Sequence, residues 1–349
     1  MGSVKDVVVL KKPTLGESGI ANFIFSDRYS VFDWGEMPNH IANKGKALCL
    51  IGAYFFEKLE EMGIRNHYLG VVENEKIKRL PELKKPVNVM QVQLLQVLKP
   101  KIEGKIYDYS VYQEEIANIL IPLEIIYRNS LPEGSSVFKR FQNGSVKPED
   151  IGLSKIPNPG QKLDRSILDV STKLEATDRY ITWDEAKNMA GLNSSELEAI
   201  QLLTHRINIL ITQESQKLDL YHEDGKVEFG IDEDCELMLV DILGTPDECR
   251  FTYQDIPVSK EAARIYYRNT PWYEEVEQAK KRDIMRWKNL VKSPPPPLPQ
   301  RLDELIAQLY MAFCNGITGR DWFETPALKN VLFELKKALQ INEPFVKDV

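Results

Sequence analysis

The chain has 349 residues, of which 43% are hydrophobic and 28% are charged, so it can bury a full core in one large domain or two lobes. Its net charge is -7 and it has no basic run, so we do not expect it to bind nucleic acid. It has no apolar run long enough to span a membrane and no secretory pattern, so we expect a cytoplasmic protein that does not bind membranes. Its four cysteines and four histidines lack the spacing of zinc sites or of a disulfide framework.

A strand pair is the first element that the sequence predicts. Residues 7–10 and 20–25 are apolar runs that flank a glycine-containing turn at residues 16–19. Such a turn can bring backbone N–H groups close to phosphates, although most hairpins of this kind bind nothing. Further along, apolar residues recur at helical spacing over residues 47–62, and residues 86–101 have the pattern of an inner strand.

The next predicted strand, residues 121–129, carries Arg128 near its end, and a small loop follows it. A guanidinium group and a serine hydroxyl with backbone N–H groups can together bind a carboxylate or a phosphate. The sequence does not separate Ser135 from Ser136 for this role. A structural ion pair between Arg128 and Glu124 is the alternative to a binding site.

A long loop is predicted at residues 142–165, which are rich in glycine, proline, asparagine and lysine. In an enzyme with phosphate-bearing substrates, a mobile loop of this kind could close over the site. Residues 182–185 then have the pattern of a capping box that starts a short helix, and a long helix is expected at residues 195–216.

A β-hairpin with an acidic turn is predicted over residues 224–241. With a two-residue turn at 234–235, Glu228 would lie directly opposite Asp241 on the other strand. Two opposed carboxylates repel unless a cation lies between them, and magnesium is suited to bind one or two carboxylates together with phosphates. Lys226, on the same face as Glu228, would add a positive charge for a phosphate. A solvated acidic hairpin is the alternative.

The C-terminal part is expected to be mostly helical. Helices are predicted at residues 259–268, 272–292, 302–313 and 326–339. The proline-rich segment at residues 293–300 predicts an extended polyproline II strap, although an SH3-type domain could also bind such a segment. We expect the last two helices to pack on the second lobe or to make a subunit contact in a homo-oligomer.

Several of these motifs, in this order, resemble those of the SAICAR synthetase family, the phosphoribosylaminoimidazole-succinocarboxamide synthases of purine biosynthesis. The central motifs are Asp-x-Lys-x-Glu-Phe-Gly at 224–230 and Thr-Pro-Asp followed by Arg at 245–250. Supporting motifs are Asp-Arg-x-Ser-x-Phe-Asp at 27–33, Pro-x-Glu-x-x-x-Arg at 122–128 and Ser-Thr-Lys-x-Glu at 171–175. The resemblance covers most of residues 20–285.

The resemblance implies an α+β fold of two lobes, with antiparallel sheets and an ATP cleft between the lobes. We expect a nucleotide-binding lobe at 1–100, a substrate and metal-binding lobe at 101–292, and a proline strap with a helical extension at 293–349. The implied reaction joins L-aspartate to the carboxylate of CAIR with ATP, giving SAICAR, ADP and phosphate. The alternatives are a kinase-like small-molecule phosphotransferase, since inositol phosphate kinases share Asp-x-Lys, and a nucleotide-binding regulator without catalysis.

The resemblance also implies roles for individual residues. Glu228 and Asp241 would hold Mg²⁺ on ATP, while Lys226 would stabilise the phosphates and Asp224 would receive or relay the proton of the aspartate amine. The residues expected to bind the substrates are Arg128, Ser136, Lys173, Asp178 and Arg250. Lys11 and Lys12 are the nearest candidates for the lysine that binds the ATP phosphates.

The sequence departs from the family pattern at several positions, which keeps the regulator alternative open. The Gly-Lys-x-Lys or Gly-Lys-x-Arg pattern is not found in the first hairpin, Ile242 stands where glutamate is usual, and Thr177 replaces a histidine. The Lys44-Gly45 step resembles the family's step before its first helix, and we expect it to be a solvated helix start with at most an anion contact.

Overall fold

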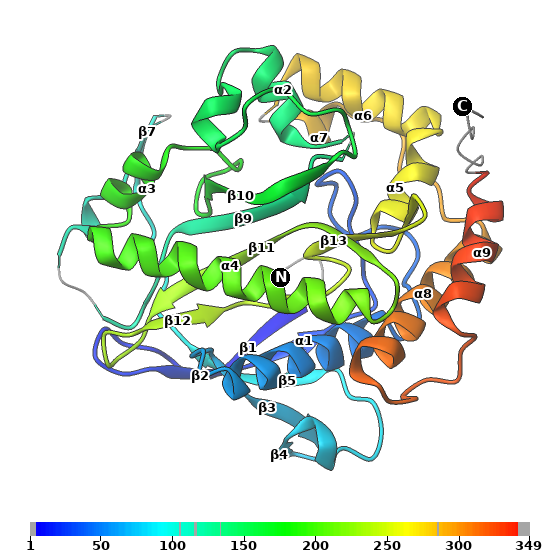
Figure 1. Ribbon diagram of the computed structural model, residues 1–349, viewed down its shortest axis with the longest axis horizontal. Helices are drawn as coiled ribbons and strands as arrows, with labels where there is room; N and C mark the ends of the chain where they lie inside the picture. The colour runs from blue at the N-terminus through cyan, green and yellow to red at the C-terminus, as the bar shows by residue number, and fades with distance from the viewer. Residues whose placement is uncertain (1–4, 105, 115–116, 133, 285, 341–349) are drawn as a thin grey trace.

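A computed structural model describes residues 5–104, 106–114, 117–132, 134–284 and 286–340. The structure contains a five-stranded and a seven-stranded antiparallel sheet, each with a long helix packed against it (Figure 1). A separate hairpin pairs β6 (Lys101–Glu103) with β7 (Ile106–Asp108). The predicted α+β class is therefore confirmed.

The five-stranded sheet has the strand order β1-β2-β5-β3-β4. Its strands are β1 (Lys5–Lys11), β2 (Gly19–Phe25), β3 (Tyr68–Glu73), β4 (Lys76–Lys78) and β5 (Val89–Leu94). Apolar residues on alternate positions of β2 are buried beneath α1 (Lys44–Glu61), which packs on β2, β3 and β5. The predicted strand pair, helix and inner strand are confirmed.

The start of α1 is fixed to the end of β2. The carboxylate of Asp27 accepts hydrogen bonds from the backbone N–H groups of Asn43 and Gly45, at 3.2 and 2.9 Å. A Cβ atom on Gly45 would lie 2.6 Å from the carbonyl oxygen of Phe25, so only glycine allows this close approach. As a result Lys44 is fully buried, and our expectation of a solvated helix start was wrong.

The seven-stranded sheet has the order β10-β9-β11-β13-β14, and β8 and β12 pair with the second half of β11. Its strands are β8 (Ile119–Leu120), β9 (Leu123–Ser130), β10 (Lys162–Thr172), β11 (Tyr221–Ile231), β12 (Leu237–Val240), β13 (Cys249–Tyr253) and β14 (Ile256–Pro257). The predicted long helix, α4 (Ser194–Gln216), lies across this sheet and packs on β9 and β11 (Figure 1). Strand β11 is thus central in the sheet.

The register of the β11–β12 hairpin differs from the prediction by one residue. Glu228 pairs with Val240, not with Asp241. The cause is a three-residue turn that closes with a backbone hydrogen bond from Asp232 to Glu236 and ends on Cys235 at φ 62°. The side chain of Asp232 supports this longer turn, because it accepts from the backbone N–H groups of residues 234 and 236.

Shorter helices lie between the strands and after the last strand. They are α2 (Ser136–Gln142), α3 (Trp183–Met189), α5 (Glu261–Arg268), α6 (Pro271–Arg282) and α7 (Trp287–Leu290), with short 3-10 helices at Leu80–Glu82, Ser110–Tyr112 and Pro148–Ile151. Of these, α3 packs on β10, at the edge of the larger sheet. Thr182 caps α3 as predicted. The helix predicted at 272–292 is divided into α6 and α7, and the end of the predicted loop at 142–165 belongs to β10.

The proline-rich segment is a packed strap. The hydroxyl of Tyr267 donates to the carbonyl oxygen of Pro296 at 3.0 Å, and the side chain of Leu298 is buried. After the strap, α8 (Gln300–Thr318) packs against α1 and against α9 (Leu328–Ala338). Phe313 of α8 also contacts Phe251 of β13, with ring centroids 5.1 Å apart, so the extension packs on elements of both the predicted first and second lobes.

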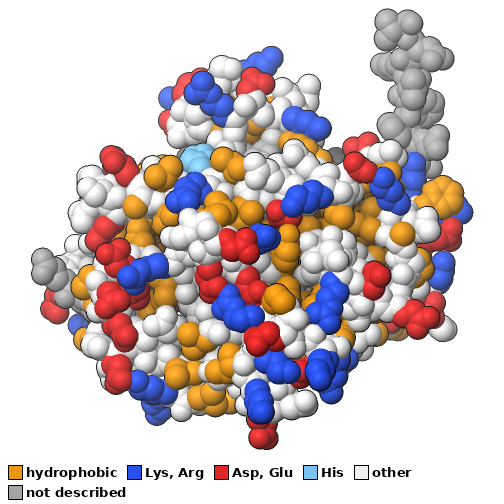
Figure 2. Space-filling model, turned by 60° about the horizontal axis from the view of Figure 1, so that its bottom comes forward, with side chains coloured by type: hydrophobic (Ala, Val, Ile, Leu, Met, Phe, Trp, Pro, Cys, Tyr) orange, Lys and Arg blue, Asp and Glu red, His pale blue; other side chains and the backbone are white. Residues whose placement is uncertain are grey.

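The surface carries both signs of charge. On the face shown in Figure 2, lysine and arginine side chains are interspersed with aspartate and glutamate side chains. Among the described residues, no helix combines the length and the apolar character that crossing a membrane requires.

Candidate active site

Three charged residues form a row across the middle of the larger sheet. Asp224 of β11 is paired in register with Arg128 of β9 on one side and with Arg250 of β13 on the other. An Nη atom of Arg128 lies 3.4 Å from its carboxylate, and Nε of Arg250 donates to it at 2.8 Å. Burial acts to raise the pKa of Asp224, but the two guanidinium groups, Arg250 above all, outweigh it and hold that pKa below its usual value.

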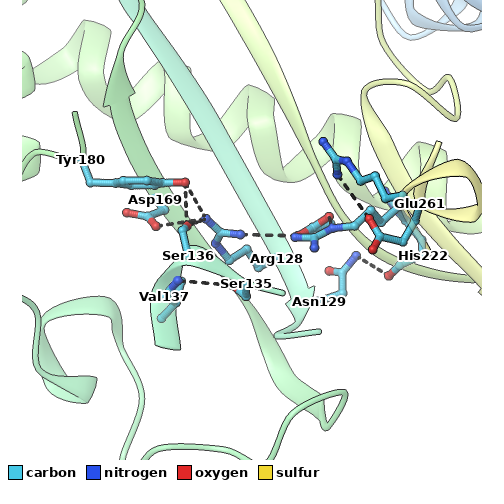
Figure 3. A network of polar contacts seen from close by, with 12 residues as sticks. Arg128, Asn129, Ser135, Ser136, Val137, Asp169, Tyr180, His222 and Glu261 are labelled. Carbon is cyan, nitrogen blue, oxygen red and sulfur yellow. Dashed lines mark hydrogen bonds and ion pairs between the residues drawn. The ribbon is translucent and has the colours of Figure 1, made fainter. Parts of the chain in front are cut away.

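A network of polar contacts lies beside Arg128 (Figure 3). The hydroxyl of Ser136 is 3.5 Å from a guanidinium nitrogen of Arg128 and donates to the hydroxyl of Tyr180 at 2.8 Å. Ser135 instead caps α2, because its hydroxyl accepts from the backbone N–H of Val137. The structure therefore separates the two serines and places Ser136 toward Arg128.

The suggested ion pair between Arg128 and Glu124 is not the one that forms. Arg128 is paired with Asp224 and with Asp169, whose carboxylate is 3.4 Å away. Glu124 lies on the same strand face but contacts Lys226, whose ammonium nitrogen is 2.9 Å distant. These ion pairs therefore join side chains on neighbouring strands, which lie closer together than Glu124 and Arg128, four residues apart on β9.

Lysines and glutamates alternate next to this row. Besides Glu124, Lys226 lies 3.5 Å from Glu248 and 4.0 Å from Glu228. Burial acts to lower the pKa of Lys226, and the surrounding glutamates outweigh it, so this pKa is raised. Lys173 reaches Glu228 from β10's end, with 2.5 Å between the ammonium nitrogen and the carboxylate. The ammonium groups thus occupy positions where they offset several carboxylates.

Asp241 lies just past β12, at φ 60°, and forms an ion pair with Lys5 of β1. Burial lowers the pKa of Lys5 to about 8, although the charges of Glu248 and Glu228 act to raise it. Lys5 therefore links the smaller sheet to the carboxylates of the larger one. Lys5 was not among the residues predicted from the sequence. Residues 2–5, Gly-Ser-Val-Lys, keep the glycine and the second lysine of the family's Gly-Lys-x-Lys pattern. Of these four residues, only Lys5 lies within the described part of the chain.

A cavity of about 340 Å³ opens over the charged row, and neither Lys5 nor Asp241 is among its lining residues. Of the residues predicted for the site, it is lined by Arg128, Ser136, Asp178, Asp224, Lys226 and Arg250. Glu228 and Lys173 are not among its lining residues but contact those that are, through Lys226 and Glu124. Lys11 forms an ion pair with Glu17, and both Lys11 and Lys12 are exposed and do not line the cavity.

The cavity is also lined by residues for which the sequence analysis predicted no role. They include Glu124, Tyr180, Asp247, Glu248, Lys260 and Arg264. The motif at 245–250 contains two of them, and the i, i+4 spacing of Lys260 and Arg264 at the start of α5 is a signal that could have indicated a shared helix face. Tyr180 carries no such signal.

The carboxylates of this cluster suit a magnesium ion that takes most of its ligands from phosphates. Within the described chain no group of three or more aspartate, glutamate, histidine or cysteine side chains could hold a metal ion by itself. Oε1 of Glu228 is buried and lacks a hydrogen bond of normal geometry among the described residues, although Lys173 lies close. One or two carboxylates are what magnesium commonly takes from a protein when phosphates supply other ligands.

The departure at residue 242 has a packing explanation. Ile242 is buried, and its Cδ1 atom occupies the space beside Gly52 of α1, where a Cβ atom would lie 1.9 Å away. This side chain therefore belongs to the core between α1 and the hairpin. Thr177 is exposed and lines a neighbouring cavity together with Asp178.

Comparisons with known proteins agree on one family. The family model described as SAICAR synthetase matches residues 2–281. A protein of Archaeoglobus fulgidus, whose name assigns it provisionally to the phosphoribosylaminoimidazole-succinocarboxamide synthases, is 52% identical over 97% of this chain and 100% of its own. The phosphoribosylaminoimidazole-succinocarboxamide synthase of Thermoplasma acidophilum is 31% identical over 92% of this chain and 98% of its own.

Solved structures of the same kind share the fold. The SAICAR synthase of Saccharomyces cerevisiae complexed with SAICAR covers 93% of this chain and 95% of its own, with a TM-score of 0.62 and 22% identity. A SAICAR synthetase in complex with ADP covers 93% of this chain and 98% of its own, with a TM-score of 0.59 and 20% identity. The predicted α+β fold of this family, with antiparallel sheets, is thus confirmed.

Proposed function

The chain belongs to the SAICAR synthetase family, and we propose that it joins L-aspartate to the carboxylate of CAIR, an aminoimidazole ribotide, with ATP. It is a carbon-nitrogen ligase, and its products are SAICAR, ADP and phosphate. The observation that carries the proposal is the row of Arg128, Asp224 and Arg250 at the floor of a cavity that also holds Lys226. Cations fixed in this way suit a reaction among three anionic substrates.

Arg128, Ser136 and Arg250 bind the ribotide in this proposal. Each arginine keeps N–H groups beyond those that Asp224 engages, and a guanidinium can donate to phosphate or carboxylate oxygens in pairs. Asp224 offsets part of the charge of the buried Arg128 and the partly buried Arg250 and fixes the orientation of both guanidinium groups when the substrate is absent. It accepts from both, and its pKa is lowered, so it is a poor proton acceptor. We therefore assign it positioning and not proton transfer.

Lys226, Lys173 and Lys5 stabilise the phosphates of ATP. Each is ion-paired to a carboxylate of this cluster and can turn toward a phosphate when the nucleotide brings further negative charge. Lys5 is better placed for this role than Lys11, the exposed last residue of β1, or Lys12, which is exposed just beyond it. Glu228 and Asp241 would hold the accompanying Mg²⁺, which offsets the charge on the phosphates during transfer.

The reaction has two bond-forming steps. A carboxylate oxygen of CAIR attacks the γ-phosphorus of ATP, the bond to the ADP oxygen breaks, and an acyl phosphate forms. The amine of L-aspartate then attacks the acyl carbon, phosphate leaves, and the amine loses a proton. Asp178 is the proposed acceptor of that proton, because it lines the cavity and its pKa is raised, first by partial removal from water and then by the charge of Glu124, although its side chain still contacts solvent.

The remaining cations of the cavity have carboxylates to bind. L-aspartate brings two carboxylates, and we assign them to the side of the cavity lined by Lys260 and Arg264. The resemblance associates Lys173 with the substrates. Its ammonium nitrogen lies 3.8 Å from Glu124, which lines the cavity, and 2.5 Å from Glu228. All substrates are water-soluble small molecules, and we place the enzyme in the cytoplasm.

An assay for product and ADP tests the proposal. ADP and SAICAR are expected only when CAIR, L-aspartate and magnesium-ATP are all present, and Glu228→Gln is expected to be inactive while remaining folded. Glu233→Gln is the control, because Glu233 is an exposed residue of the hairpin turn. ATP turnover without amide formation would contradict the ligase assignment and would favour the phosphotransferase or regulator alternatives.

A further inference from the structure

The hydroxyl of Tyr180 belongs to the network of polar contacts beside Arg128 (Figure 3). It accepts a hydrogen bond from the hydroxyl of Ser136 at 2.8 Å, and a guanidinium nitrogen of Arg128 lies 3.4 Å from it. In the part of the chain that the structure describes, both contacts use the phenol oxygen as the acceptor. A phenol has one O–H donor, so that donor is left for a group inside the cavity.

The ring of Tyr180 is held in one orientation by its neighbours. The guanidinium group of Arg140 lies over it, 4.3 Å from the ring centroid, and donates to Asp169 at 2.5 Å. Asp169 is also an ion-pair partner of Arg128, so one buried carboxylate orients the cation on each side of the tyrosine. The backbone is fixed too, because Tyr180 forms a bridge with Ser171 of β10.

Tyr180 also separates two cavities. It lines the cavity of about 340 Å³ that holds the charged row, and it lines a neighbouring cavity of about 550 Å³ together with Arg140 and Asp169. Its ring therefore forms part of the wall between them, and its hydroxyl contacts two predicted substrate-binding groups, Ser136 and Arg128. A side chain in this place determines which ligand atoms fit next to Arg128.

We propose that Tyr180 is a substrate-binding residue whose O–H group donates a hydrogen bond to an anionic oxygen of the ribotide held by Arg128 and Ser136. This inference rests on the proposed function for the identity of the ribotide. A neutral donor next to a guanidinium adds a directed hydrogen bond without adding a charge that would need a further counter-ion. It therefore contributes to the affinity for the ribotide and to its orientation.

The test is Tyr180→Phe, which removes the hydroxyl and keeps the ring beneath Arg140. Loss of a hydrogen bond to a charged group is expected to raise the KM for CAIR roughly tenfold or more, with kcat and the KM for ATP and L-aspartate nearly unchanged. Tyr221→Phe is the matched control. Its hydroxyl donates to the backbone of Asn129 at 2.8 Å on the same sheet and does not line the cavity, so its KM values are expected to stay at the wild-type level.

Calorimetric titrations distinguish the two anionic groups of the ribotide. If Tyr180 donates to the phosphate, Tyr180→Phe weakens binding of a ribotide that lacks the imidazole carboxylate as much as it weakens binding of CAIR. If it donates to the carboxylate, only CAIR binding is weakened. Unchanged KM and unchanged titrations in the variant would overturn the assignment. If Tyr180→Phe weakens ribotide binding but the wild-type protein makes no SAICAR, the proposed function is contradicted and the assignment of Tyr180 stands.

Discussion

The hydroxyl of Tyr310 donates a 2.6 Å hydrogen bond to Oδ1 of Asp247, and this contact joins the C-terminal extension to the wall of the cavity. The second oxygen of Asp247 accepts from the ammonium group of Lys44, also at 2.6 Å. Tyr310 and Lys44 are fully buried and come from α8 and α1. Helices that are distant in the chain thereby fix the orientation of one cavity-lining carboxylate.

Tyr310→Phe should therefore affect both stability and activity. The loss of a buried hydrogen bond to a carboxylate is expected to lower the free energy of unfolding by about 2 kcal/mol and to lower kcat/KM, because Asp247 becomes free to reorient. Tyr54→Phe is the control, since the hydroxyl of Tyr54 donates to Glu214 at 2.9 Å and lies outside this cavity. Denaturant unfolding and steady-state kinetics of both variants check this, and equal activity in the two would contradict it.

The charged row predicts a large effect of Asp224→Asn. This change leaves Arg128 and Arg250 without their shared counter-ion in a buried place, and we expect the free energy of unfolding to fall by about 3 kcal/mol at neutral pH. The exposed ion pair of Asp219 with Lys329 gives the control, and Asp219→Asn should cost at most about 0.5 kcal/mol.

The same variant has an expected pH dependence. Because the pKa of Asp224 is lowered from 3.8 by folding, its ionised form contributes stability above that value, and the contribution is lost as the pH falls through the folded-state pKa. The difference in the free energy of unfolding between wild type and Asp224→Asn should stay constant near neutrality and shrink in acid below pH 3.8. Denaturant titrations at several pH values measure it. A difference that grew in acid would have the wrong sign.

Gly225 is predicted to tolerate no side chain. A Cβ atom there would lie 2.2 Å from the hydroxyl of Tyr127 and 2.8 Å from the sulfur of Cys249, and both of these groups are buried. Gly225→Ala should destabilise the protein by about 1–3 kcal/mol through overpacking and should also displace the neighbouring Asp224. At Gly16 a Cβ atom would meet nothing within 4 Å, so Gly16→Ala should unfold at the wild-type temperature.

The role of Asp178 predicts an acid limb in the pH profile of kcat. The carboxylate must be ionised to accept a proton, and its raised pKa places the loss of activity at a pH above 3.8, the ordinary value. Asp178→Asn should lower kcat by about a hundredfold or more. Rate measurements at saturating substrates check both, and a variant that keeps the wild-type kcat would assign the proton to another group.

Local patterns in the sequence were enough for most of the fold. The apolar spacing that predicted a helix at 195–216 corresponds to α4, Ser194–Gln216, because an apolar stripe with helical spacing is buried only when the helix packs on the sheet. The register of the β11–β12 hairpin was not predictable in this way. Cys235 occupies the left-handed position that glycine usually takes in a three-residue turn, so the sequence carries no sign of the longer turn.

Long-range contacts account for what the sequence analysis missed in the site. Lys5 and Asp241 are 236 positions apart, and only the packing of the two sheets brings them together. Tyr180 also gave no motif, because its role depends on contacts with Ser136, at the start of α2, and with Arg128 of β9. The roles of Arg128 and Arg250 were suggested by motifs, but their common partner Asp224 follows from strand order.

Isotope transfer tests the central claim that ATP activates the carboxylate of the ribotide. CAIR labelled with ¹⁸O in that carboxylate is incubated with ATP, magnesium and L-aspartate, and the released phosphate is analysed by mass spectrometry. Attack of the carboxylate on the γ-phosphorus predicts one ¹⁸O atom in each phosphate molecule, in an amount equal to the SAICAR formed. Unlabelled phosphate would show that ATP is hydrolysed by water and would contradict the account.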